Sequence, residues 1–165
     1  MAEAPAPLDT PTDLNRNATR SVADALNMAL ASSYTLYLKT KNYHWHVSGP
    51  HFRDYHLMLD DQATQILATT DVIAERVRKT GNTTLRSIGD IARRSSLTDD
   101  DREFVAPAEM LSVLRDDNLK LVECLRAARE AAEDAKDTAT SSLADEWIDQ
   151  AEERAWFLFE ASRSA

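Results

Sequence analysis

The sequence NYHWHVSGPHFRDYHLMLDDQATQILATTDVIAERV, residues 42–77, indicates both the fold and the candidate site. Two pairs of metal-binding side chains occur within it at a spacing of four residues, His56 with Asp60 and Asp71 with Glu75. Because an α-helix repeats about every 3.6 residues, the two members of each pair lie on one face, one turn apart. Each pair therefore forms half of a potential metal site.

The distance between the two pairs decides how such a site is completed. Asp60 and Asp71 are eleven residues apart in the sequence, which corresponds to roughly 16 Å along a helix axis. The donor atoms of one metal ion all lie within about 2.2 Å of it, so one copy of the helix cannot bring both pairs to the same ion. If two copies pack antiparallel about a two-fold axis near Gln65 and Ile66, the first pair of one copy lies opposite the second pair of the other. The spacing thus predicts two equivalent sites across a dimer interface.

The composition predicts a single helical domain. The chain has 165 residues, of which 43% are hydrophobic, and this suffices for one domain with a sizeable core. It contains only three glycines and five prolines, while alanine, leucine and charged residues abound, so we expect helices and no strands.

Hydrophobic periodicity and helix-breaking residues divide the chain into four long helices and one short helix. The predicted long helices run from a start between Asp13 and Asn17 to about Val47, from the break at Ser48-Gly49-Pro50 to Gly81, from Pro107 to about Lys136, and onward from the polar run 137–142; the short helix covers 85–92. Two helix hairpins joined by a long crossover predict an all-α, ferritin-like four-helix bundle with a short extra helix in the crossover. We assign the bundle to residues 14–162 and a flexible tail to residues 1–13.

The charge and the absence of targeting segments limit the functional classes. The net charge is −9, so the surface as a whole repels polyanions such as free DNA and attracts metal cations. No apolar stretch is long enough for a membrane span, and residues 1–16 lack the pattern of a secretory signal. With one cysteine, Cys124, no disulfide forms within the chain. We expect a cytoplasmic protein without a membrane partner.

The stretch NYHWHVSGPHFRDYHLMLDDQ, followed by DVIAERV and Gly81, closely resembles the Dps family, the DNA-protection-during-starvation mini-ferritins. The resemblance extends over about residues 19–159 and includes the short helix of the crossover and the late AWFLFE segment. It implies a ferroxidase that oxidises Fe²⁺, with hydrogen peroxide preferred over O₂, and stores ferric oxide within a hollow homo-dodecamer assembled from two-fold dimers. Iron is then substrate and product, and no organic cofactor is implied.

The resemblance also implies the ligands of the ferroxidase site. Residues at the ligand positions of the family are His44, His56, Asp60, Asp71 and Glu75. This set contains the two pairs found from helix geometry and adds His44 at the end of the first helix. Trp45 matches a family tryptophan beside the site, whereas His46 and His51 do not match ligand positions and are expected at the surface.

Two features depart from the family pattern. The acidic residues near the start of the last helix are candidates for an iron-entry pore or a mineral-nucleating surface: Asp137, Asp145, Glu146 and Asp149. The common Thr-Ala-Asp of the family reads Thr-Ser-Ser here, at 140–142, so one expected carboxylate is absent. Many relatives bind DNA through a Lys/Arg-rich terminal arm, whereas the first 20 residues here contain only Arg16 and Arg20 as basic residues. We therefore expect weak or absent DNA binding.

Three hypotheses follow from the sequence. The first is an iron-oxidising storage enzyme that protects DNA from oxidative damage. The second is a nucleoid-associated shell that protects DNA mainly by direct, non-specific binding. The third is a helical bundle whose acidic row forms salt bridges to a protein partner. A purely structural alternative for Asp71 and Glu75 is that they pair with Arg76 or Arg78 on a solvated face.

Overall fold

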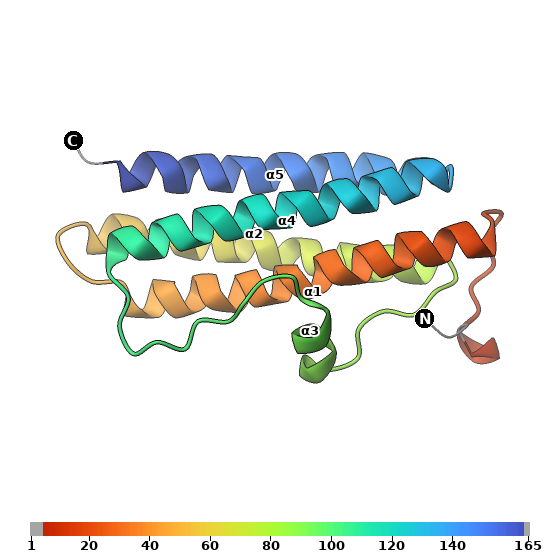
Figure 1. The fold of residues 1–165 in the computed structure, drawn as a ribbon, viewed down its shortest axis with the longest axis horizontal. Helices are drawn as coiled ribbons and strands as arrows, with labels where there is room; N and C mark the ends of the chain where they lie inside the picture. Colours follow the sequence, from red (N-terminus) through yellow and green to blue (C-terminus); the bar gives the residue numbers. More distant parts are fainter. Residues whose placement is uncertain (1–4, 164–165) are drawn as a thin grey trace.

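The computed structural model describes residues 5–163, which form an all-helical bundle without a strand among them (Figure 1). The elements are a 3₁₀ turn at Ala6–Leu8 and the helices α1 Arg16–His46, α2 Phe52–Lys79, α3 Ile88–Arg94, α4 Pro107–Asp134 and α5 Thr138–Ser162. The predicted fold class, with its short helix in the crossover, is confirmed. Within residues 5–163, no helix has the length and apolar character needed to cross a membrane.

Local sequence explains where the helices begin and end. The Asn15 side chain accepts hydrogen bonds from the backbone N–H groups of residues 17 and 18 and so caps α1. Gly49, with φ 101°, and Gly81, with φ 78°, occupy the left-handed region that other residues rarely adopt, so they mark the turn before α2 and its end. Pro107 stands at the first position of α4, where its missing N–H has no intrahelical partner to lose.

The four long helices form two antiparallel hairpins, α1 with α2 and α4 with α5 (Figure 1). The connection from α2 to α4 returns along the length of the bundle and carries α3, which packs on α1. The largest fully buried aliphatic side chains come from all four long helices: Leu26, Leu30, Leu36, Leu59, Ile66, Ile73, Leu111, Leu114, Leu125 and Leu158. Burial of each such side chain stabilises the fold by about 1.5–3 kcal/mol relative to an exposed one.

Buried polar groups tie the helices together at specific positions. Lys39 of α1 contacts Asp117 of α4 at 2.7 Å, with both side chains largely buried. Arg154 of α5 donates to the side-chain oxygens of Asn118 on α4 and Gln65 on α2, at 2.8 and 2.7 Å. These bonds fix the lateral order of the helices because each donor reaches its acceptor only in one packing arrangement.

The start of α5 differs from the prediction. The polar run 137–142 was expected to separate the last two helices, but only Asp137 lies outside a helix, and α5 begins at Thr138. The reason is capping: an Asp137 carboxylate oxygen accepts the backbone N–H of Thr140 at 3.1 Å. The reversal itself is made at Lys136, which has φ 58°.

The domain division at residue 13 stays a prediction. Residues 1–4 of the predicted tail lie outside the described residues, while residues 6–8 form the 3₁₀ turn. The segment after this turn contacts the end of α2, since Arg78 donates hydrogen bonds to the Leu8 carbonyl at 2.6 Å and to the Thr10 hydroxyl at 3.3 Å.

Candidate metal centre

Two histidines lie face to face where α1 ends and α2 begins. The rings of His44 and His56 stack with centroids 3.8 Å apart. Nδ1 of His44 lies 2.8 Å from the carbonyl oxygen of His56, and Nδ1 of His56 lies 2.9 Å from the carbonyl oxygen of His44. A carbonyl oxygen only accepts, so each Nδ1 carries the hydrogen, and Nε2 of each neutral ring keeps its lone pair. Both imidazoles are therefore held in the tautomer that binds a metal through Nε2.

Asp60 lies one turn after His56 and adds a carboxylate to this end of the bundle. Its Oδ1 atom is 3.9 Å from Nε2 of His44 and accepts a hydrogen bond of 2.7 Å from Lys41 Nζ. The hydrogen bond from the Lys41 ammonium lowers the pKa of Asp60, so this side chain is a carboxylate at neutral pH. We call His44, His56 and Asp60 the His–Asp half-site.

Asp71 and Glu75 lie about three and four turns beyond Asp60 along α2, on its exposed side. The Glu75 side chain is 59% exposed, and its carboxylate is 3.0 Å from Lys79 Nζ. The i,i+4 spacing places the two carboxylates on one face, where both point away from the core of their own chain. We call this pair the acidic half-site.

The two half-sites remain apart within one chain. Among residues 5–163, no group of three or more histidine, cysteine, aspartate or glutamate side chains is arranged to hold a metal ion. This agrees with the separation of roughly 16 Å that the helix rise gives for Asp60 and Asp71. The assignment of all five residues as ligands stays a prediction, because only a second chain could unite them.

The other two histidines lie outside both half-sites. His46 is exposed, and its Nδ1 lies 2.8 Å from the carbonyl oxygen of Asn42 in the preceding turn. His51 is exposed beside the ring of Tyr55, at 5.6 Å between centroids. Neither shares a contact with Asp60, in accordance with the surface positions expected for both.

Asp137 does not suit the pore role suggested by the sequence. Its side chain is only 2% exposed and contacts Arg76 Nη2 at 2.6 Å, so it joins α2 to the start of α5 instead of facing solvent. Burial alone raises the pKa of Asp137, but hydrogen bonds from Arg76 and Thr140 outweigh it and hold the pKa below its usual value. Of the other candidates, Asp145 is exposed and pairs with Arg129 at 2.5 Å.

Lys41 is a component of the His–Asp half-site that sequence reasoning missed. It precedes His44 by three residues, and its ammonium lies 5.8 Å from the centroid of the Trp45 ring as well as against Asp60. The i,i+3 spacing to a candidate ligand was the available indication, since such residues share a helix face. The contact with Asp60 depends on the packing of α1 against α2.

Comparisons with known proteins identify the family. Residues 23–161 match the family model of a ferritin-like domain. A DNA protection during starvation protein from Brevibacillus brevis is 32% identical over 137 residues, covering 83% of this chain and 91% of that protein. The protein of the same name from Agrobacterium fabrum (strain C58) is 31% identical over 149 residues, covering 90% and 92%.

A solved structure agrees with these relatives. DpsA14 from Streptomyces coelicolor is similar with a TM-score of 0.87 and 29% identity, over 95% of this chain and 93% of that one. The match of the family model spans the whole bundle, from α1 to the last turn of α5. The chain therefore belongs to the Dps family of ferritin-like proteins, as the motif around the two histidines predicted.

Proposed function

We propose that this protein is an iron-storage ferroxidase whose metal sites form between two copies of the chain. The observation that carries the proposal is the placement of two incomplete, complementary half-sites along α2, one of them joined by the buried His44 at the end of α1. A two-fold axis near Gln65 and Ile66 pairs residue i of one copy with residue 131 − i of the other, where 131 is the sum of the two numbers. His56 then lies opposite Glu75, and Asp60 lies opposite Asp71.

Exposed apolar side chains around the half-sites support a second copy as the partner. Leu67 lies on the same side of α2, between the ligand candidates Asp60 and Asp71. This apolar residue is 42% exposed. Trp45 and Phe52, which border the two histidines, are 58% and 46% exposed. An apolar strip that mixes with incomplete donor sets is typical of a surface that association covers.

The donor atoms suit iron as the substrate. Two neutral imidazoles and three carboxylates bind Fe²⁺ moderately, and the carboxylates stabilise the higher charge of Fe³⁺ further, which favours loss of an electron. Two Fe²⁺ ions supply the two electrons that, with two protons from solvent, reduce one hydrogen peroxide to two water molecules, so no hydroxyl radical is released. The removal of Fe²⁺ and peroxide together would protect DNA in the cytoplasm from oxidative damage. Ferric oxide would collect inside a dodecameric shell.

A complementation experiment tests whether the site is shared. We would prepare one variant with His56→Ala and Asp60→Ala and a second with Asp71→Ala and Glu75→Ala. Each alone should lose the fast phase of Fe²⁺ oxidation by peroxide. In co-expressed chains, half of the dimers are mixed and each mixed dimer keeps one of its two sites, so about one quarter of the wild-type rate should return.

The controls separate this proposal from its alternatives. His51→Ala removes an exposed histidine outside both half-sites and should leave the rate unchanged. If the co-expressed variants stay inactive although mass spectrometry detects mixed dimers, the shared site is wrong. The second candidate function, a shell that protects DNA by binding it, is opposed by the net charge of −9 and is tested separately below.

A further inference from the structure

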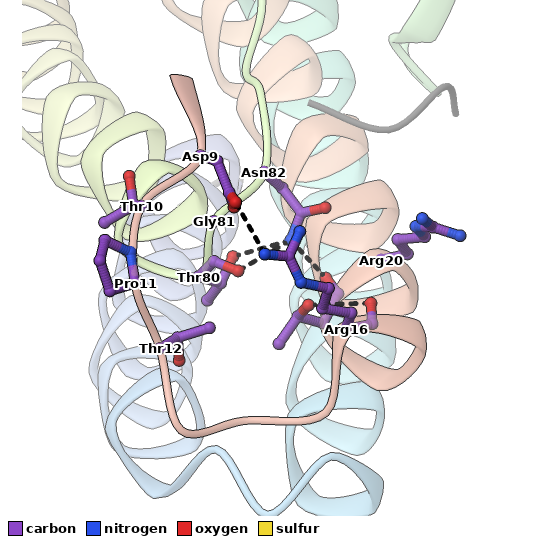
Figure 2. A pocket seen from close by; sticks show the side chains of 10 residues that line it. Asp9, Thr10, Pro11, Thr12, Arg16, Arg20, Thr80, Gly81 and Asn82 are labelled. Carbon is purple, nitrogen blue, oxygen red and sulfur yellow. Dashed lines mark hydrogen bonds and ion pairs between the residues drawn. The ribbon is translucent and has the colours of Figure 1, made fainter. Parts of the chain in front are cut away.

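The segment 5–12, here called the strap, lies across the end of α2 on the same side as the acidic half-site. Figure 2 shows it passing Thr80, Gly81 and Asn82 before the chain turns into α1, with Asp9 bonded to Arg16 at 2.7 Å. Its close approach requires Gly81, because a Cβ atom there would come within 3.0 Å of the Thr10 carbonyl oxygen. The strap is therefore fitted to this end of the helix.

Arg78 is the residue of α2 that the strap holds. Asp71, Glu75 and Arg78 have the spacing i, i+4 and i+7, so they follow one another along a single helix face. The Arg78 guanidinium donates to the carbonyl oxygens of Leu8 and Asn82 and to the Thr10 hydroxyl. All of these acceptors are uncharged.

No carboxylate neutralises Arg78 among residues 5–163, although Glu75 lies only one turn before it. Glu75 instead contacts Lys79 at 3.0 Å. An arginine three residues after a glutamate ordinarily reaches its carboxylate, and a guanidinium matches two carboxylate oxygens at once. The hydrogen bonds to the oxygens of Leu8, Thr10 and Asn82 hold the Arg78 guanidinium away from Glu75.

We infer that the strap is a positioning element of the metal site, which keeps the Arg78 guanidinium away from Glu75 so that a metal ion has one cation, Lys79, to displace from this carboxylate instead of two. The inference rests on the proposed function, in which Glu75 is a ligand. Without the strap, Arg78 would turn toward Glu75 and compete with the metal. A metal ion that must displace a cation from a carboxylate binds more weakly. The binding free energy that is lost equals the attraction between that cation and the carboxylate.

The test measures Co²⁺ affinity by calorimetry and by the visible absorption of bound Co²⁺, which needs no turnover. Deletion of residues 2–12 should raise the Kd about 1.5- to twofold, the size expected for one ion pair at this spacing. Arg78→Gln in the full-length chain should leave the Kd near the wild-type value. In the Arg78→Gln background, the same deletion should have no effect. In an Arg126→Gln background, a matched exposed arginine on α4, the effect of the deletion should persist.

The outcomes distinguish the strap from the site itself. If full-length protein with His56→Ala and Asp60→Ala binds Co²⁺ as wild type does, the proposed function fails. If wild type binds at the site but the deletion leaves the Kd unchanged, the strap inference alone fails. It fails equally if the deletion weakens binding to the same extent with and without Arg78, because loss of folding or assembly would act in both backgrounds. Light scattering of each variant reports the assembly directly.

Discussion

Lys41 donates a hydrogen bond of 2.7 Å to Oδ1 of Asp60, the carboxylate oxygen that also lies 3.9 Å from Nε2 of His44. The ammonium therefore occupies the side of the carboxylate that faces the imidazoles. A metal ion that binds Asp60 together with the histidines must displace this ammonium or share the carboxylate with it. At the proposed site, Lys41 would thus compete with the metal ion for Asp60.

Removal of the Lys41 charge should strengthen metal binding. We expect Lys41→Gln to lower the Kd for Co²⁺ about threefold, because one attraction to a half-exposed carboxylate no longer has to be overcome. Titration calorimetry measures the change. Lys120→Gln, which removes an exposed lysine paired with Glu123 on α4, is the matched control and should have no effect. A Kd equal to or above that of wild type would contradict the competitor role.

The pair of Asp137 and Arg76 should make stability depend on pH. The pKa of Asp137 is held below its usual value in the folded protein, so its stabilisation is fully present above about pH 4 and is lost as the pH falls through the folded value. Asp137→Asn should cost about 3 kcal/mol at pH 7, a fall in Tm of about 9 °C. The difference in Tm should narrow below pH 4. Asp149→Asn, at an exposed position, is the control. A difference in Tm between wild type and Asp137→Asn that does not change with pH would contradict the role of this ion pair.

Arg154 should stabilise the bundle through its acceptors and not through an ion pair. It is 4% exposed, no carboxylate pairs with it among residues 5–163, and burial lowers its pKa to about 10, so it remains charged at pH 7. Arg154→Met leaves the side-chain oxygens of Asn118 and Gln65 unpaired, which should cost about 2 kcal/mol and lower the Tm by about 6 °C.

A compensated variant checks the cause of that loss. Addition of Gln65→Leu and Asn118→Leu to Arg154→Met removes the unpaired acceptors and should recover most of the Tm. Thermal scans at equal protein concentration measure all three proteins, because assembly also affects the Tm. If the triple variant melts lower than the single one, the oxygens are not the cause.

DNA should not be retained at neutral pH. The net charge is −9, and the first 20 residues contain only Arg16 and Arg20 as basic residues, so this segment offers few cations that could neutralise phosphates. We expect no retardation of duplex DNA in gels at about 50 mM salt and pH 7.5. A variant with ten appended lysine and arginine residues is the positive control. Retardation by wild type that weakens steadily with salt would favour the DNA-binding shell.

The sequence predicted the features that depend on neighbours along the chain. Gly81 and Pro107 act within one helical turn, so their residue types alone located two helix boundaries. The first helix starts within the predicted interval between Asp13 and Asn17, although its cap is Asn15 and neither of those two residues. The i,i+4 spacing of Asp71 and Glu75 likewise placed two carboxylates together without knowledge of the fold. Hydrophobic periodicity in the four long helices was sufficient to predict the four-helix bundle.

Features that depend on distant residues escaped prediction. Asp137 was a candidate pore residue in the sequence, where its partner Arg76 lies 61 residues away. Nothing in the local sequence shows that the start of α5 packs against Arg76 and buries this carboxylate. Arg78 and Leu8 are 70 residues apart, so their contact follows only from where the strap returns. Such side chains acquire their roles from packing, which residue type does not encode.

The reciprocal bonds between His44 and His56 have a consequence for repeated use of the protein. Each ring is hydrogen-bonded to the main chain of the other helix, so we expect the corner between α1 and α2 to keep its shape when a metal ion binds or leaves. Losing an ion should then leave the subunit ready to accept another without local unfolding. The same subunit would then bind and release metal ions repeatedly.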